Sequence, residues 1–218
     1  MKRTKGFTLV EIAIVLVIIG LLLGGILKGQ EMITQAKIKN VIADMSGVSA
    51  AMYGYQDRYK ALPGDDKLAT RWSGATAGDG DGIISGKWTA TSTEALNFWD
   101  HLRRSGFISG SGAENPFNAV SGKLGVQTGD GPAAGSNPGS VLQESTGSGT
   151  AFSSLILCSG NLPDKIAVSV DSQMDDGIGT KGSVRGMLQS APNPATLSAT
   201  ASAYAEDGVS TYVVCRLL

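Results

Sequence analysis

The stretch KGFTLVEIAIVLVIIG, residues 5–20, places a carboxylate, Glu11, near the start of a long apolar run. From Phe7 to Leu27 the only polar residues are Thr8 and Glu11. As an α-helix that rises about 1.5 Å per residue, this run reaches roughly 31 Å, which matches the thickness of a bilayer core. The sequence therefore predicts a membrane-spanning helix that contains one charged side chain.

Three basic residues, Lys2, Arg3 and Lys5, precede this run. Under the positive-inside rule they keep the N-terminus in the cytoplasm and send the chain after Lys28 across the membrane. A conventional secretory signal has a shorter apolar region, of about 7–15 residues, followed by a small-residue cleavage site, and neither feature is present. A plain signal-anchor is the simplest alternative, but it does not explain Glu11, because a carboxylate in a spanning helix costs about 2.5–3.5 kcal/mol and usually has a partner.

The segment from Lys5 to Gly20 resembles the class III signal of type IV pilins and of the pseudopilins of type II secretion. The resemblance extends to about Lys28. It implies that a prepilin peptidase cuts the bond between Gly6 and Phe7 and methylates Phe7, the new N-terminal residue. Residues 1–6 are then a leader peptide, and the apolar segment stays on the protein.

The same resemblance implies a partner for Glu11. Cleavage creates an α-amino group on Phe7, one helical turn from Glu11 in the same subunit or opposite the Glu11 of a neighbouring subunit. In a medium of low dielectric such a charge pair offsets much of the cost of burying the carboxylate. Glu11 is therefore expected to act in subunit assembly.

A helical pattern continues beyond the membrane run. Apolar residues recur at spacings of three and four from Ile38 to Tyr59, which places them on one face of a helix. We interpret this stripe as a seam against a globular head. An exposed coiled-coil strand is the weaker alternative, because Gly47 and Gly54 interrupt the stripe. The turn residues ALPGDD, residues 61–66, are expected to end the helix near Tyr59.

A second helix is predicted in TSTEALNFWDHLRRSGF, residues 91–107, where Thr91 and Glu94 fit a capping box and Gly106 fits a stop. The single histidine, His101, lies on this helix without a nucleophile suggested nearby, so we expect a structural role. The sequence contains no nucleotide-binding loop, nucleophile elbow or metal-spaced His/Cys cluster, and an enzyme is not expected.

The remaining chain is expected to be rich in loops. Residues 109–150 are dominated by Gly, Ser, Ala and Thr and are interpreted as a variable surface loop that contributes no core. Residues 166–174 fit either a helix or a strand, whereas STYVVCRL, residues 210–217, fits a terminal strand. The expected fold class is α+β and, as the resemblance implies, pilin-like, with a long N-terminal helix packed on a small antiparallel sheet and a large loop region.

Four parts are expected along the chain. Residues 1–6 are the cleaved leader, and residues 7–27 are the transmembrane and assembly half of the N-terminal helix. Residues 28–60 are the soluble half of that helix, and residues 61–218 are the globular head.

The two cysteines, Cys158 and Cys215, lack the close spacing of a zinc site. A single disulfide is predicted if the head is exported, with two free buried thiols as the alternative. The bond would close a loop of about 57 residues and contribute about 4 kcal/mol in the chain-entropy model. It would resemble the disulfide-closed C-terminal region of many pilins.

Two acidic segments raise the possibility of a calcium site, because oxygen-rich turns suit a hard cation. The candidate ligands are Asp79 and Asp81 in GDGDG, residues 78–82, and Asp175 and Asp176, with Asp171 close by in the sequence. The first segment fails the EF-hand pattern, since the twelfth loop position falls on a tryptophan. Solvated Asp-Gly turns are the favoured interpretation, and no other cofactor is expected.

The resemblance implies a structural subunit of a type IV pilus-like filament, assembled through its N-terminal helices, with head loops free for adhesion, DNA uptake or secretion. Alternatives are a type II secretion pseudopilin, a minor pilin or a membrane-tethered monomeric binding module. Implied partners are identical or related pilin subunits, a prepilin peptidase, an inner-membrane assembly platform and, before assembly, membrane lipid. The precursor is expected to cross the bacterial inner membrane once, and the filament to be periplasmic or extracellular. A net charge of −1 without a basic patch does not suggest direct nucleic-acid binding.

Overall fold

A computed structural model describes residues 8–145 and 149–218 of the chain. The leader and the predicted cleavage site between Gly6 and Phe7 lie outside the described residues. The chain divides into two compact units, Met1–Lys37 and Ile38–Leu218, which are treated separately below.

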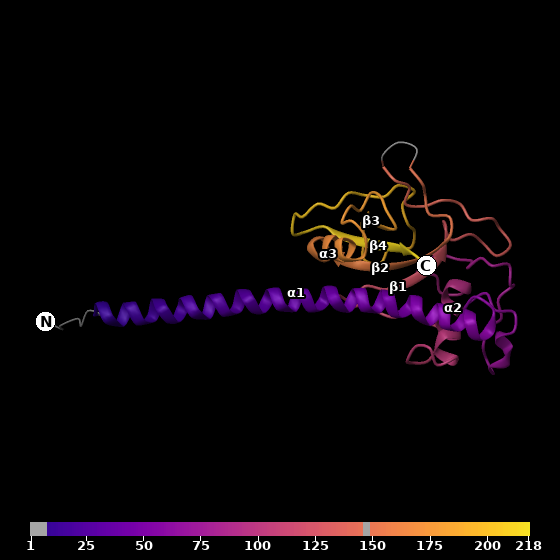
Figure 1. Cartoon of the computed structure of the whole chain (residues 1–218), viewed down its shortest axis with the longest axis horizontal. Helices are drawn as coiled ribbons and strands as arrows, with labels where there is room; N and C mark the ends of the chain where they lie inside the picture. Colours follow the sequence, from indigo (N-terminus) through magenta and orange to yellow (C-terminus); the bar gives the residue numbers. More distant parts are fainter. Residues whose placement is uncertain (1–7, 146–148) are drawn as a thin grey trace. The chain divides into compact units, whose positions relative to one another are not determined.

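Helix α1 runs from Leu9 to Tyr59 and passes through both units (Figure 1). Its side chains from Leu9 to Leu27 are exposed all around the helix. It is the one helix among residues 8–145 and 149–218 that is long and apolar enough to cross a membrane. A helix that is apolar on every side needs lipid or other helices around it, so this segment is suited to a membrane or to a bundle of its own kind.

In the second unit, α1 packs on the head through the stripe that the sequence predicts. The buried side chains on this stripe are Ile38, Val41, Met45, Val48, Met52 and Tyr55. The helix ends at Tyr59, and the next residue, Lys60, has a φ of 55°, in the left-handed region. The packed-helix interpretation is therefore confirmed, and the exposed coiled-coil alternative is wrong.

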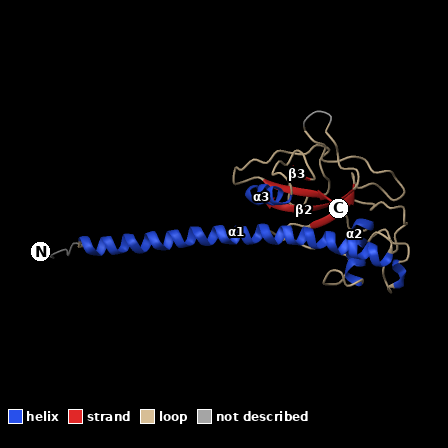
Figure 2. Cartoon of the chain, viewed as in Figure 1, coloured by secondary structure: helices blue, strands red, loops and turns tan. Residues whose placement is uncertain are grey.

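The head contains one antiparallel sheet of four strands in the order β1-β2-β4-β3 (Figure 2). The strands are β1 (Leu124–Thr128), β2 (Leu155–Pro163), β3 (Val184–Leu188) and β4 (Thr211–Leu217). The predicted α+β class, with a long N-terminal helix packed on a small antiparallel sheet, is confirmed.

Alternate side chains of the strands enter two different cores. On β2 and β4, Leu157 and Val214 point into a core with α1, α2 (Glu94–Arg104) and α3 (Asp164–Met174). Their neighbours Cys158 and Val213 join a second core with residues of the surrounding loops, such as Leu142. Helices therefore cover one face of the sheet and loops cover the other, which follows from the two-residue period of a strand.

The expectation that residues 109–150 contribute no core is wrong. Residues Leu124–Thr128 form β1, and every one of them is buried. Val141 and Leu142 are also buried, against the loop-covered face of the sheet. A few apolar residues are enough to contribute to the core, because β1 is only five residues long. The rest of the segment folds over the sheet as turns.

The predicted capping box at Thr91 and Glu94 is also wrong. Helix α2 begins at Glu94, so that Thr93 is the N-cap residue. The Glu94 carboxylate accepts hydrogen bonds from the backbone N–H groups of Asp79 and Ser85 instead, each at 3.0 Å. These partners come from a loop that folds against the helix, which local sequence spacing does not reveal. The ambiguous segment after Pro163 is helical, as α3.

Candidate functional site: the start of α1 and the anchoring of the head

Thr8 and Glu11 form a capping box at the start of α1. The Thr8 hydroxyl accepts the Glu11 backbone N–H at 3.2 Å. The Glu11 carboxylate in turn accepts the backbone N–H and the hydroxyl of Thr8, both at 2.8 Å and both through Oε2. The sequence analysis did not identify this capping box, although the spacing Thr-x-x-Glu is its usual sequence signature.

This geometry leaves Glu11 available for a further contact. Both hydrogen bonds end on Oε2, and within residues 8–145 and 149–218 the other oxygen, Oε1, has no hydrogen-bond or ion-pair partner. The carboxylate also lies in the first helical turn, where the helix macrodipole favours a negative charge. The predicted partner, the α-amino group of Phe7, falls outside the described residues.

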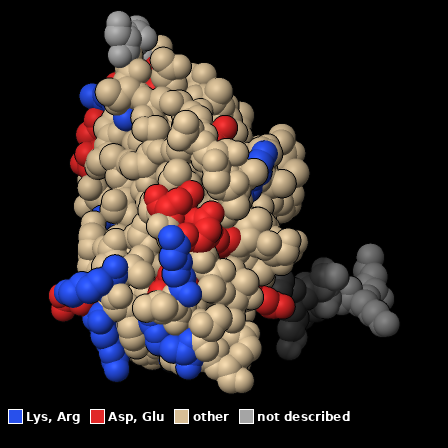
Figure 3. Space-filling model, turned by 90° about the vertical axis from the view of Figure 1, so that its right-hand side faces the viewer, with Lys and Arg blue, Asp and Glu red and all other residues tan. Residues whose placement is uncertain are grey.

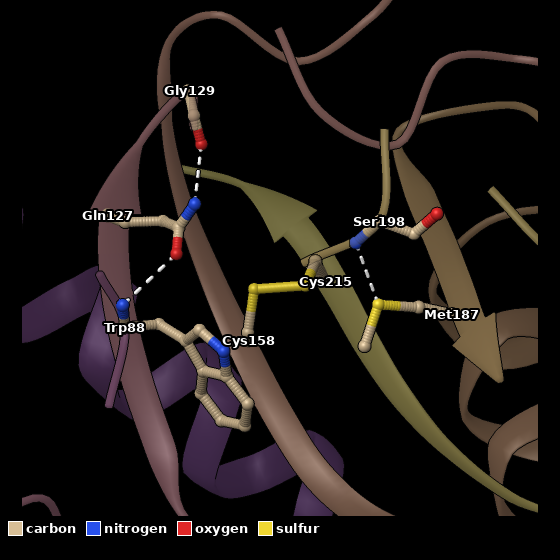
Figure 4. The surroundings of a disulfide bond; sticks show 7 residues. All are labelled: Trp88, Gln127, Gly129, Cys158, Met187, Ser198 and Cys215. Carbon is tan, nitrogen blue, oxygen red and sulfur yellow. Dashed lines mark hydrogen bonds between the residues drawn. A yellow bond between two sulfur atoms is a disulfide. The ribbon is translucent and has the colours of Figure 1, made fainter. Parts of the chain in front are cut away.

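Cys158 and Cys215 lie directly opposite each other on the central strands β2 and β4 and form the predicted disulfide. Both residues are fully buried, and within the described chain no cysteine is free. Figure 4 shows the indole of Trp88 beside the bond, with the carboxamide of Gln127 joined to the backbone of Trp88 and Gly129. The bond therefore ties the last strand to the centre of the sheet inside the loop-covered core.

The structure places Asp79 and Asp81 next to a third carboxylate, Asp65. Asp65 is buried and accepts the backbone N–H groups of Gly80 and Gly82, the latter at 2.7 Å. Burial raises the pKa of Asp65, and these hydrogen bonds oppose that rise. The sequence analysis did not include Asp65 in this group, because Asp65 is distant from the GDGDG segment in the sequence and is brought next to it only by folding.

Asp175 and Asp176 lie next to Asp171, as their closeness in the sequence suggests. Asp171 is fully buried and accepts the Tyr204 hydroxyl at 2.7 Å, and burial raises its pKa. In each group, one buried carboxylate is thus held by hydrogen bonds that shape a loop. The other carboxylates are exposed. Carboxylate oxygens are suitable ligands for a hard cation. The hydrogen bonds to Asp65 and Asp171 nevertheless account for these two buried carboxylates without a bound cation.

Seen from the right-hand side of Figure 1, the surface shows acidic side chains gathered in a patch with basic side chains beside it (Figure 3).

His101 of α2 is fully buried and uses both of its ring nitrogens. Nδ1 accepts the backbone N–H of Gly64 at 2.8 Å, and Nε2 donates to the carbonyl of Thr76 at 2.8 Å. This pair of contacts requires a neutral ring with its proton on Nε2, and it joins the turn after α1 to the following loop. The predicted structural role of His101 fits this arrangement.

We expect the head to lose stability in mild acid through His101. Burial lowers the pKa of His101 despite the nearby carboxylates of Asp66 and Asp100, and Arg71 adds to the lowering. In the unfolded chain the histidine has its usual pKa of about 6.5, so below that pH the unfolded chain binds more protons than the folded chain. The free energy of unfolding therefore falls as the pH drops from about 6.5 through the lowered pKa of the folded chain. Thermal unfolding of the wild type and of His101→Gln at pH values from about 7.5 to 5 measures this, since glutamine can bond to the same backbone groups without titrating. The melting temperature of the wild type should fall more than that of His101→Gln as the pH drops. An equal fall in both proteins would contradict this role of His101.

Residues 1–27 match the family model of the prokaryotic N-terminal methylation motif. A comparison with curated proteins finds no match to the chain. The matched segment contains the capping box and the exposed apolar helix described above, and it supports membrane anchoring through that helix. The motif implies assembly with pilin subunits and handling by a prepilin peptidase, and it suggests a structural protein rather than an enzyme. This chain therefore carries the N-terminal signature of the type IV pilin and pseudopilin family.

Proposed function

We propose that the protein is a structural subunit of a type IV pilus-like filament. The observation that carries the proposal is the methylation motif at residues 1–27, which runs without interruption into an exposed apolar helix. A tether to the membrane needs the apolar helix alone. A filament subunit needs, in addition, a processing site and a polar group that sets the register of neighbouring helices, and Glu11 is suited to that role.

In this proposal the precursor crosses the bacterial inner membrane once, with its N-terminus in the cytoplasm. A prepilin peptidase cuts the bond between Gly6 and Phe7 and the Phe7 amine is methylated. An assembly platform in the inner membrane then moves the subunit from lipid into the filament, where the α1 helices of related subunits replace lipid around each other. The filament is periplasmic or extracellular, and the role needs neither a catalytic residue nor a cofactor.

Assembly replaces one apolar environment by another, so burial of the α1 side chains contributes little net driving force. Close helix packing and the satisfaction of polar groups matter more in such a medium. The proposed pair between the Glu11 carboxylate and the methylated Phe7 amine provides this polar contribution to the stability of the filament. It also distinguishes one register between neighbouring helices from all others, because a slipped helix would leave both charges without a partner.

Processing is the first test. We expect mature protein from the membrane to lack residues 1–6 and to carry one added methyl group on Phe7, as measured by intact mass and N-terminal sequencing. Gly6→Val, which puts a bulky side chain before the cut, should keep its leader. Gly20→Ala is the matched control, because a side chain added there meets nothing within 4 Å, and it should be processed normally. An intact leader on the wild type in a host with an active prepilin peptidase would argue for a monomeric tethered module.

Electron microscopy of sheared surface filaments, combined with mass spectrometry of their subunits, separates the remaining alternatives. A pilus subunit should be the bulk component of long surface filaments. A minor pilin would be present at a low ratio to another subunit, and a secretion pseudopilin would be found in short periplasmic filaments.

A further inference from the structure

A groove runs along one side of α1 in the head and contains a carboxylate without a partner. Its lining includes Asp44 and Gly47 of α1, Trp99 of α2 and the side chain of Phe117, which is 63% exposed. Asp44 is half-buried, and among residues 8–145 and 149–218 the structure gives it no hydrogen bond and no ion pair. Burial raises the pKa of Asp44, as expected for a carboxylate that has lost water without gaining a donor.

Among the described residues, Arg103 is the one cation that lines the same groove, and it is already engaged. Arg103 donates from Nη1 to the carbonyl of Gly112 at 2.7 Å. The charges that bear on its pKa are those of Asp100 and Glu114, not that of Asp44. The Asp44 carboxylate therefore faces a groove with both polar and apolar walls that a cation from outside the subunit can enter.

A second groove on α1 carries the opposite charge. It is lined by Ile42 and Ser46 of α1, Met174 at the end of α3, and Arg216 and Leu217 of β4. The Arg216 guanidinium donates from Nε to the carbonyl of Leu217 at 3.4 Å, its one hydrogen bond within the described residues. No carboxylate pairs with it in the part of the chain that the structure describes. Leu217 is 37% exposed beside it.

The two grooves lie on opposite sides of α1 and at the same height. Successive residues of an α-helix are rotated by about 100°, so Ile42 and Asp44 point to nearly opposite sides. The α1 residues that line the grooves fall between Ile42 and Val48, a stretch of about 9 Å along the axis. Two parallel copies placed side by side with a small axial shift would therefore bring the basic groove of one against the acidic groove of the other.

We propose that Arg216 of one subunit enters the groove of the next subunit and pairs with its Asp44. The inference rests on the proposed function, because the occupant of the groove is a second copy of this chain. Leu217 of the first copy would lie against Phe117 of the second, so the ion pair would be shielded from water by apolar contacts. The two surfaces are different, which makes the contact heterologous, and a heterologous contact that does not close on itself repeats into a helical array.

Charge reversal tests the pair in the full chain. Asp44→Arg and Arg216→Asp should each reduce the amount of sheared filament at least about tenfold, because each leaves like charges facing across an interface. The double variant Asp44→Arg, Arg216→Asp should recover most of the wild-type amount, since the pair is restored with its polarity exchanged. Asp57→Arg is the matched control on the same helix; Asp57 is 89% exposed and pairs only with Lys60 within the described residues, so filaments should form.

Asp44→Asn and Arg216→Gln separate an effect on assembly from an effect on folding. Asp44→Asn removes a partly buried charge without a partner, so the unassembled subunit should melt at the wild-type temperature or above it while filament yield falls. Normal filament yield from both neutral variants and both reversals would overturn the pair and leave the proposed function intact. Failure of the double variant to recover, with a wild-type melting temperature, would also overturn it. Absence of filaments from the wild type would overturn the pair and the proposed function together.

Discussion

Replacing Glu11 with alanine is expected to abolish filament assembly while the precursor still inserts into the membrane. Insertion depends on the apolar run of α1, and losing one charge from that run favours insertion. In the proposed filament, assembly depends on Glu11, because the variant would leave the Phe7 amine of each subunit without its anion. Removing one partner of a buried charge pair costs about 3–5 kcal/mol, and every subunit in the filament would bear that cost. Membrane fractionation and the amount of sheared filament measure the two outcomes separately.

Glu11→Gln distinguishes two roles of this side chain: capping of helix α1, which the structure shows, and the proposed charge pair with the Phe7 amine. Glutamine can still accept the Thr8 backbone N–H, so the capping box survives. It cannot pair with an amine as an anion. If the charge pair drives assembly, Glu11→Gln should fail as Glu11→Ala does. If helix capping is the only contribution, Glu11→Gln should assemble and Glu11→Ala alone should be weakened, by no more than the ~1 kcal/mol of a lost cap.

Glu31→Gln is the matched control for this series. Glu31 lies on the same helix with its side chain 60% exposed, and it pairs with Lys28 at 2.7 Å. An exposed ion pair of this kind is worth about 0–1 kcal/mol, so filaments should form normally. A Glu11→Ala variant that assembles as well as Glu31→Gln would contradict the proposed role of Glu11 and favour the monomeric tether.

Removing the disulfide is expected to have the largest effect on the stability of the head. The double substitution Cys158→Ala, Cys215→Ala should lower the free energy of unfolding by about 4 kcal/mol in the chain-entropy model, given the sequence separation of 57. Single domains are stable by only about 5–15 kcal/mol, so this is a large share of the total. Chemical denaturation of the detergent-solubilised chain, followed by the fluorescence of its three tryptophans, measures the change. One of them, Trp88, lies beside the bond (Figure 4).

The double alanine variant should still reach the native pairing of strands. Cys158 and Cys215 are opposite each other in a register that the adjacent pairs Leu157 with Arg216 and Ser159 with Val214 also hold. We therefore expect the variant to fold with the same sheet but to unfold at a lower denaturant concentration. Wild-type chain unfolded and refolded in reductant is the matched control and should show a similar loss. A loss below about 1 kcal/mol in both would mean that strand pairing already restricts the unfolded chain, contrary to the chain-entropy account.

Local signals explain which expectations the structure confirms. The apolar run and the stripe from Ile38 to Tyr59 are read from spacing alone, because helical periodicity repeats within a few residues. The end of α1 follows from Pro63 and its turn neighbours for the same reason. The pairing of Cys158 with Cys215 needs no knowledge of the fold either, since two cysteines allow only one intramolecular bond.

The errors concern residues whose partners are distant in the sequence. Glu94 has the spacing of a capping residue, but Asp79 and Ser85 compete for its carboxylate once their loop folds over α2. Strand β1 is hidden in a segment of small residues, because five residues are too few to stand out until β2 pairs with them. Both outcomes depend on contacts between segments that composition and spacing do not connect.

By itself, the sequence determined the long apolar run, the processing motif and the helical seam of the head, since each pattern repeats or is complete within a short stretch of residues. Only the tertiary structure decided which loops cover the second face of the sheet and which carboxylates gather around Asp65. It also decided that Asp44 and Arg216 lie in grooves on opposite sides of α1 with no ion-pair partner among the described residues. A side chain's partners are set by the folding of distant segments against it, and a carboxylate that lacks a partner cannot be recognised until that folding is known.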